Sequence, residues 1–286
     1  MNETTLDFET TSRFADGAGV RLHYNIAGDG PPLVMLHGGG PGATGWSNFK
    51  QNLQTLSEHF TVILVDQPGF GRSEKPEEYD VPFWKFSARA VCGLLDTLGL
   101  DKVSFVGNSL GGGTTLQFAL DYPDRADRLV LMGPGGGAFN IFSTDPTEGI
   151  KLLMGWNAPP GPSKEKLEAF LRIMVYDQSL ITESLIEERY AAATIPENLE
   201  GQFAALVSMA SDPKGSQLWR RFDEISQPTL LTWGRDDRVL PLDGSFMALK
   251  MIPDVRLHVF SRCGHWAQLE QQAEFDDQVR VFLGAG

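Results

Sequence analysis

The sequence alternates between short apolar runs of strand length and longer segments with helical spacing, and this alternation restricts the possible folds most strongly. The apolar runs are continuous, which indicates strands buried on both faces, as in a parallel sheet. They span residues 33–36, 61–65, 103–106, 129–132, 229–233 and 257–260. Between several of them, apolar residues recur every 3.6 positions, for example Trp46, Phe49, Leu53, Leu56 and Phe60. This order predicts a doubly wound α/β sheet.

The alternation stops between about residues 138 and 211, where no strand-like run occurs. Apolar spacing over 167–175 predicts an amphipathic helix, and residues 180–193 and 199–209 also have helical patterns. Because strands resume at Thr229, we predict a helical insertion rather than an independent second domain. The expected organisation is a core of residues 1–137 and 212–286, interrupted by a helical lid over residues 138–211.

Composition excludes several classes of partner and cofactor. With 24 basic and 37 acidic side chains the formal net charge is −13, which argues against nucleic acid and anionic membranes as partners. The first 16 residues have no signal-peptide pattern, and no apolar run approaches the roughly 20 residues of a membrane span, so we expect a cytoplasmic protein. Cys92 and Cys263 are the only cysteines, and metal and nucleotide motifs are absent, so we expect free thiols, no metal and no cofactor.

The segment Gly107-Asn-Ser-Leu-Gly111 has the pattern G-x-S-x-G, directly after the apolar run 103–106 and directly before a helical segment. In that setting a sharp turn presents the hydroxyl of Ser109 at the carboxyl edge of the sheet, while the glycines let neighbouring backbone pass closely. The alternative is a glycine-rich turn with an incidental serine. The context favours Ser109 as a nucleophile.

A nucleophilic serine needs a base, and the chain has five histidines. His23 and His258 lie in strand-like runs, His59 ends a polar helix, and His37 opens a glycine-rich turn. This leaves His265, just after the last apolar run, as the predicted base.

The residue that orients the base is expected after the preceding apolar run, in Gly234-Arg-Asp-Asp-Arg-Val-Leu-Pro241. Asp237 has the position G-x-x-D-x-x-x-P and is the predicted acid, with Asp236 as the alternative. The chain order Ser, Asp, His is that of the α/β-hydrolase fold, which is the fold we predict.

Acyl transfer at a serine also needs two donors aimed at the developing oxyanion. The amide of Leu110, directly after the nucleophile, is one candidate. The loop His37-Gly-Gly-Gly-Pro-Gly42 follows the first apolar run and fits an HGGG-type oxyanion loop, in which we choose Gly39 as the second donor. A phosphate cradle is the rival use of such a loop, but no partner lysine or ribose-binding acid completes it.

Over nearly its whole length the chain resembles the meta-cleavage product hydrolases, which hydrolyse carbon–carbon bonds in aromatic and steroid ring degradation. The motifs that carry this resemblance are His37-Gly-Gly-Gly-Pro-Gly-Ala43 with Trp46-Ser-Asn48, Gly107-Asn-Ser-Leu-Gly-Gly112, Met132-Gly-Pro-Gly-Gly136, Pro146-Thr-Glu-Gly149, Val175-Tyr-Asp177, Leu180-Ile-Thr-Glu183 leading to Arg189, Gly234-Arg-Asp-Asp-Arg238, and Cys263-Gly-His-Trp-Ala267. A generic hydrolase would share the nucleophile turn and the triad, but not the insertion and Trp266 segments.

The resemblance implies a 2-hydroxy-6-oxo-hexa-2,4-dienoate substrate, which water splits beside the ketone into 2-hydroxypentadienoate and a carboxylic acid. By resemblance, His265 also assists the proton movement that turns the dienol into a keto form. Arg189, Asn108 and Trp266 would hold the carboxylate and 2-oxo end of the substrate. Further substrate contacts implied by the family are Asn48, Ser179 and Gly40.

These implied contacts have simpler readings. Arg189 could be a solvated ion-pairing residue, Trp266 could pack in the core, and Asn108 could merely suit a tight turn. Within the family, Thr11-Ser-Arg-Phe-Ala15 and Val65-Asp-Gln-Pro-Gly69 look most like the actinobacterial steroid-degradation branch, and much of the rest is also similar to the biphenyl branch.

The resemblance implies a homodimer or higher homo-oligomer and a small anionic substrate as the partner. Two other functions stay open for the same residues: a carboxylesterase or lactonase, and a non-enzymatic small-molecule receptor.

Overall fold

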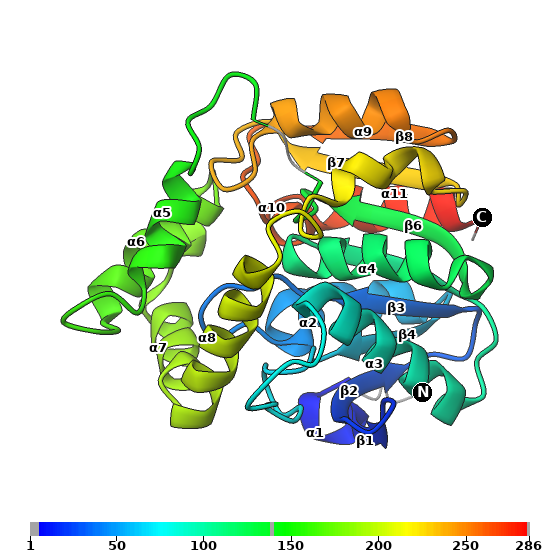
Figure 1. Ribbon diagram of the computed structural model, residues 1–286, viewed down its shortest axis with the longest axis horizontal. Helices are drawn as coiled ribbons and strands as arrows, with labels where there is room; N and C mark the ends of the chain where they lie inside the picture. The colour runs from blue at the N-terminus through cyan, green and yellow to red at the C-terminus, as the bar shows by residue number, and fades with distance from the viewer. Residues whose placement is uncertain (1–5, 138–139, 285–286) are drawn as a thin grey trace.

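A single eight-stranded sheet forms the centre of the computed structural model, which describes residues 6–137 and 140–284 (Figure 1). The strand order is β1-β2-β4-β3-β5-β6-β7-β8. β1 and β4 pair antiparallel with β2, and the remaining neighbours are parallel. The strands are β1 (Ser12–Asp16), β2 (Arg21–Ala27), β3 (Pro32–Leu36), β4 (Thr61–Val65), β5 (Val103–Asn108), β6 (Ala126–Met132), β7 (Thr229–Gly234) and β8 (Val255–Phe260).

The predicted doubly wound α/β fold is confirmed, and each of the six continuous apolar runs is a parallel strand. In β3, Leu33 to Leu36 are completely buried because helices cover both faces of the sheet. Fully burying side chains of this size stabilises the fold by about 1.5–3 kcal/mol each. The register places Leu36 opposite both Val65 and Gly107, so the loops after β3, β4 and β5 begin side by side at one edge.

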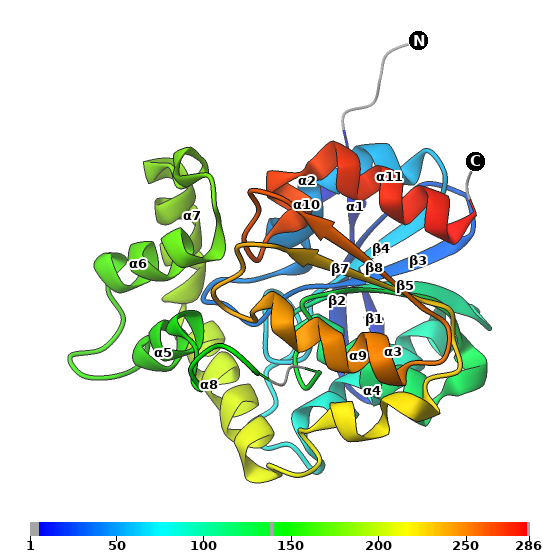
Figure 2. The same ribbon diagram turned by 90° about the horizontal axis from the view of Figure 1, so that it is seen from above.

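Helices on the two faces complete the core, as the view along the sheet shows (Figure 2). One face carries α2 (Gly45–Ser57), α10 (Ala267–Glu270) and α11 (Gln272–Leu283), and the other carries α3 (Phe83–Leu98), α4 (Leu110–Asp121) and α9 (Ser245–Met251). Shorter elements are α1 (Phe8–Thr11) and the 3₁₀ turns Pro123–Arg125, Leu218–Glu224 and Leu242–Gly244. None of the described helices is long and apolar enough to cross a membrane.

Four helices of the inserted segment gather beyond the carboxyl ends of the parallel strands (Figure 1). They are α5 (Glu148–Gly155), α6 (Lys164–Met174), α7 (Glu183–Ala193) and α8 (Pro196–Ser211), with a 3₁₀ turn at Gln178–Leu180. Their apolar side chains form a cluster of their own, which packs on Val239 and Trp266 from loops of the core. Apolar spacing predicted α6, α7 and α8 but missed α5. The predicted boundary at residue 138 and both chain ends lie outside the described residues.

Candidate active site

Ser109 occupies a strained turn between β5 and α4. Its φ of 52° and ψ of −113° are unusual for a residue with a side chain, and α4 begins at the next residue, Leu110. Neighbouring backbone leaves no room for a Cβ at Gly111, which would collide with the carbonyl oxygen of Leu36. A strained serine at a strand-to-helix turn is the geometry of a nucleophile elbow.

Asp237 and His265 form a buried hydrogen-bonded pair on the loops after β7 and β8. Asp237 Oδ2 lies 2.6 Å from His265 Nδ1, and Asp237 Oδ1 accepts bonds from the amides of Val239 (2.8 Å) and Leu240 (2.9 Å). Asp236, the alternative acid, instead contacts Arg235 at 3.1 Å. His265 Nε2 is buried and bonds to no described residue, so it is free to take a proton. The structure therefore brings Asp237 to His265 in the orientation that a general base needs.

The glycine-rich loop packs against Leu110 and Ser109 at the start of α4. A Cβ added at Gly39 would be 3.1 Å from Leu110 Cδ2, and one added at Gly38 would be 3.4 Å from Ser109 Cβ. Within residues 6–137 and 140–284, neither the amide of Gly39 nor that of Leu110 bonds to an acceptor. Two unengaged N–H groups next to a strained serine can stabilise an oxyanion.

Gln67, which follows β4, holds these two donor segments together. Its Nε2 donates to the carbonyl of His37 (2.8 Å), and its Oε1 accepts from Thr114 Oγ1 of α4 (2.6 Å). Its amide donates to His37 Nε2 at 3.0 Å, and His37 Nδ1 faces the carbonyl of Gly38 at 2.7 Å. Burial lowers the pKa of His37, which favours the neutral imidazole that this arrangement needs. The sequence pattern around Gln67 predicts no such role, because a lone glutamine gives no signal of distant partners.

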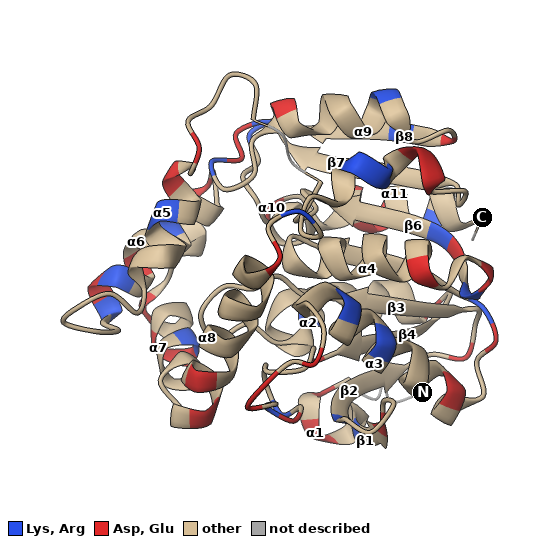
Figure 3. Cartoon of the chain, in the orientation of Figure 1, with Lys and Arg blue, Asp and Glu red and all other residues tan. Residues whose placement is uncertain are grey.

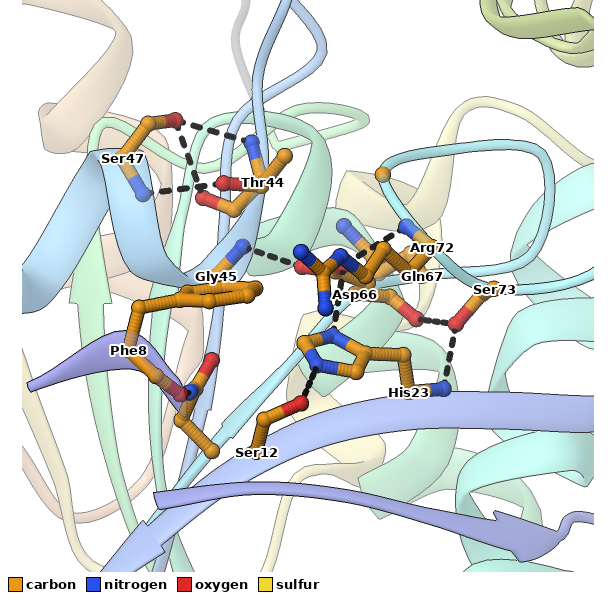
Figure 4. Close-up of polar contacts among 12 residues, drawn as sticks. Phe8, Ser12, His23, Thr44, Gly45, Ser47, Asp66, Gln67, Arg72 and Ser73 are labelled. Atoms are coloured by element: carbon orange, nitrogen blue, oxygen red, sulfur yellow. Dashed lines mark hydrogen bonds and ion pairs between the residues drawn. The ribbon is translucent and has the colours of Figure 1, made fainter. Parts of the chain in front are cut away.

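A second Ser–His–Asp set lies near the start of the chain (Figure 4). His23 Nε2 lies 2.8 Å from Ser12 Oγ, and His23 Nδ1 lies 2.8 Å from Asp66 Oδ2. Unlike Ser109, Ser12 has ordinary extended backbone with φ −68° and ψ 131°, and none of Ser12, His23 and Asp66 lines the cavity beside Ser109 and His265. Asp66 also accepts bonds from the amides of Gly45 (2.8 Å) and Arg72 (2.9 Å). This set therefore anchors the start of α2 and the turn after β4.

We expect Asp66→Asn to lower the free energy of unfolding by about 3 kcal/mol, because the amide cannot satisfy all the donors that face the buried carboxylate. Burial by itself would raise the pKa of Asp66, but the hydrogen bond and charge of His23 outweigh it and hold the pKa below its ordinary value. When the pKa of a carboxyl group is lower in the folded than in the unfolded state, ionisation of the group stabilises the folded protein at pH values above the unfolded-state pKa. This stabilisation is lost as the pH falls through the folded-state pKa. The variant should thus lose acid sensitivity below about pH 4.

Urea unfolding of the wild type and the variant between pH 3 and 7 measures both effects. The control is Asp80→Asn, since Asp80 is exposed and pairs with Arg89 on the surface. Asp80→Asn should lower the free energy of unfolding by less than about 1 kcal/mol. Equal unfolding free energies for the wild type and Asp66→Asn at pH 7 would contradict the anchoring role.

Arg189 of α7 is a buried cation that pairs with no carboxylate among the residues that the structure describes. It is 3% exposed, and its nearest acidic influence is the neighbouring Glu188. Its Nη2 donates to the carbonyl of Pro41 (2.7 Å), and its Nη1 lies 3.4 Å from Ser47 Oγ. Burial lowers the pKa of Arg189 to about 10, so it stays charged at neutral pH. A buried, unpaired guanidinium favours binding of an anion.

Most of the other predicted contact residues surround this cation. The Arg189 guanidinium lies 5.6 Å from the ring centre of Trp266. A Cβ at Gly40 would be 2.8 Å from the Phe170 ring and 3.6 Å from Arg189 Nη2. Asn48 Nδ2 donates to Asn108 Oδ1 at 3.4 Å, and both side chains are buried. The structure thus collects Arg189, Trp266, Gly40, Asn48 and Asn108 into one region beside Ser109.

Ser179 does not join this region. It is exposed, lies outside the residues that line the cavity, and its hydroxyl donates to Asp177 Oδ1 at 2.7 Å. That bond closes a local turn before α7 and leaves the side chain on the outer surface. The structure therefore does not bring Ser179 together with the other predicted contact residues.

A cavity of about 280 Å³ connects these groups. Ser109, His265 and Arg189 all line it, and most of its other lining side chains are apolar, among them Leu153, Met154, Leu206, Met209 and Leu240. Arg189 and His265 are its only ionisable lining residues within the described chain. Figure 3, which colours the ribbon by charge, shows charged residues mainly on the outer helices and loops.

Comparisons with known proteins agree with this fold and site. The model of the alpha/beta hydrolase fold family matches residues 31–272. The chain belongs to the α/β-hydrolase family.

Among α/β hydrolases, the chain is 45% identical to a 2-hydroxy-6-oxo-6-phenylhexa-2,4-dienoate hydrolase of Comamonas testosteroni, covering 98% of this chain and 99% of that protein. It is 43% identical to a 2-hydroxy-6-oxononadienedioate/2-hydroxy-6-oxononatrienedioate hydrolase of the same species, covering 100% and 99%. A solved 2-hydroxy-6-oxo-6-phenylhexa-2,4-dienoate hydrolase from Rhodococcus is similar at a TM-score of 0.86 and 30% identity, covering 95% and 98%.

Proposed function

We propose that this α/β hydrolase cleaves a carbon–carbon bond in a 2-hydroxy-6-oxo-hexa-2,4-dienoate, giving 2-hydroxypenta-2,4-dienoate and a carboxylic acid. The observation that carries the proposal is the buried, carboxylate-free Arg189 at one part of a cavity that also holds Ser109 and His265. An ordinary esterase has no need of an internal cation. Hydrolases of two dienoate classes among the similar proteins support the same reaction.

In this proposal Ser109, His265 and Asp237 form the catalytic triad. His265 Nε2, which bonds to no described residue, takes the proton from the nucleophilic hydroxyl, and Asp237 fixes the ring through Nδ1. The amides of Gly39 and Leu110 stabilise the oxyanion that forms at the ketone oxygen. Water supplies OH to the ketone carbon. The leaving carbon takes its hydrogen from the 2-hydroxyl in the preceding dienol-to-keto step, and the remaining proton of the water restores the 2-hydroxyl as the electron pair of the broken bond moves to the 2-oxo oxygen.

Binding of the substrate carboxylate at Arg189 would help the reaction to overcome a poor leaving group. A carbanion is a poor leaving group, so the dienol must first become a keto form that can accept the electron pair of the breaking bond. Arg189, with Asn48, Asn108, Trp266 and the backbone at Gly40, would hold the carboxylate and 2-oxo end while His265 moves the proton. The spacing of Ser109 and Arg189 along one cavity then sets the ketone beside the nucleophile.

The inserted segment, residues 138–211, is proposed to act as a lid. Leu153, Met154, Phe170, Met174, Arg189, Leu206 and Met209 all come from it and line the cavity. A site closed by this segment would exclude bulk water from the apolar part, which strengthens the electrostatic interactions at Arg189.

The apolar lining favours a bulky, uncharged group on the ketone carbon. A second carboxylate there would be buried without a cation, which costs several kcal/mol. The resemblance to the steroid-degradation branch makes a steroid-derived substituent the finer proposal, with phenyl as the runner-up.

A substrate panel tests both levels of the proposal. We expect loss of the yellow dienoate absorbance with equimolar formation of the two acids. We also expect kcat/KM to be at least about 100-fold higher for phenyl and steroid-like dienoates than for the nonadienedioate, the difference that burial of a second charge predicts. Turnover of a simple aryl ester alone would reject the carbon–carbon reaction, and equal turnover of the dioate would reject only the neutral substituent.

Two further features stay predictions: assembly as a homodimer or higher oligomer, and action in the cytoplasm. Light scattering during size-exclusion chromatography tests the first, and fractionation of the producing cells tests the second.

A further inference from the structure

Glu270, the last residue of α10, lies between the loop that carries His265 and the inserted segment. Its Oε1 accepts a bond from the amide of Gly264 (2.6 Å). Its Oε2 accepts bonds from the amides of Tyr176 (2.6 Å) and Asp177 (3.0 Å), which follow α6. One half-buried carboxylate therefore receives three backbone N–H groups from two segments about 90 residues apart in the chain.

The same two segments also touch directly. The amide of His265 donates to the carbonyl of Met174 at 2.7 Å, and a Cβ at Gly264 would be 2.6 Å from that same oxygen. The backbone position of His265 is thus defined on one side by the end of α6. Glu270 binds the amides of Gly264, Tyr176 and Asp177, which flank this contact on both segments. It therefore stabilises the contact between the end of α6 and the loop that carries His265.

We infer that Glu270 is a positioning residue for His265, which couples the placement of the inserted segment to the orientation of the base through the three N–H bonds. It touches neither the cavity nor the pair of Asp237 and His265 directly. This inference rests on the proposed role of His265 as the base.

Both carboxylate oxygens are needed for this role, because donors face each of them. Burial raises the pKa of Glu270, and the bonds from Asp177, Gly264 and Tyr176 act in the opposite direction by stabilising the carboxylate. A glutamine in its place has one acceptor oxygen, so its NH₂ group would face N–H donors on one of the two sides. The isosteric variant therefore disconnects one segment while it preserves the packing.

The test compares Glu270→Gln and Glu270→Ala with the wild type. We expect kcat for a dienoate to fall about 10-fold in the glutamine variant and about 100-fold in the alanine variant, since a displacement near 1 Å at a reacting group costs about that much. The dissociation constant of the dienoate, titrated by absorbance in an added Ser109→Ala background, should change less than about 2-fold, because Arg189 and its neighbours are untouched. The control is Glu274→Gln, whose carboxylate contacts His258 at 2.9 Å on the exposed side of α11.

Wild-type kcat in the folded glutamine variant would overturn the inference. So would a loss of dienoate binding in proportion to the loss of kcat, because that pattern indicates general disturbance of the cavity. If the alanine variant does not fold, the glutamine variant decides. The proposed function fails separately, if the wild-type enzyme turns over no dienoate, so the two failures are distinguishable.

Discussion

Ser109→Ala is expected to reduce kcat for a dienoate at least about 10³-fold and to leave the substrate bound in the cavity. Removal of the nucleophile of a catalytic triad lowers kcat by this factor or more. The remaining activity comes from substrate binding and from the oxyanion donors. The Oγ atom makes no contact that holds the fold, and the strained backbone at φ 52° suits alanine no worse than serine. The measurement is single-turnover absorbance of the yellow dienoate, which separates binding from cleavage.

The matched control is the serine of the second Ser–His–Asp set. Ser12 lies 2.8 Å from its histidine, but Ser12, His23 and Asp66 line no part of the cavity that Ser109 and His265 line. Ser12→Ala should therefore keep kcat within about 2-fold of the wild type. Retained cleavage in Ser109→Ala, or a large loss in Ser12→Ala, would show that the wrong set has been assigned to catalysis.

Arg189→Ala is expected to lower kcat/KM for the dienoate about 100-fold. A hydrogen bond to a charged group is worth about 1.5–3 kcal/mol, and here the bond lies in a buried site without a competing carboxylate. An uncharged aryl ester has no carboxylate for Arg189 to bind, so its hydrolysis should stay within about 3-fold of the wild type. Arg189→Lys should recover part of the loss, since lysine keeps the charge but not the planar pair of donors.

The ester also controls for damage to the oxyanion loop, because Arg189 bonds to the carbonyl of Pro41 in that loop. Arg172→Ala serves as the control within the inserted segment, as Arg172 pairs with Glu168 on the surface of α6. Equal losses on ester and dienoate in Arg189→Ala would mean that the side chain holds the loop rather than the substrate.

Sequence patterns predicted the parts of the site that are local in the chain. The turn at Ser109 is encoded by a strand, a serine between glycines and a helix, all within about 20 residues. The histidine after the last strand and the acid after the preceding strand are fixed by the same logic, since carboxyl ends of parallel strands share one edge. These features need no knowledge of which side chains meet.

The parts that sequence reasoning missed depend on contacts between distant segments. Asp66 and His23 read as ordinary strand-end and strand residues, because their bond joins β2 to the end of β4. Glu270 and Gln67 bind backbone groups, which any residue type supplies, so no partner pattern exists to detect. The family pattern also marked Ser179 as a substrate contact, which stays a prediction, and in this structure the residue is exposed and bonded to Asp177.

The inserted segment donates hydrogen bonds to the proposed oxyanion loop at two points. Arg189 donates to the carbonyl of Pro41, and Gln202 Nε2 donates to the carbonyl of Gly39 (2.8 Å). The proposed substrate-binding segment and the proposed oxyanion loop are therefore joined by direct hydrogen bonds. We therefore expect substitutions that move the inserted segment to disturb the glycine-rich loop as well. We expect the substrate range of such enzymes to change through single substitutions at Met154, Leu206 or Met209. A chimaera that exchanges the whole insertion between relatives should need the glycine-rich loop of the same relative.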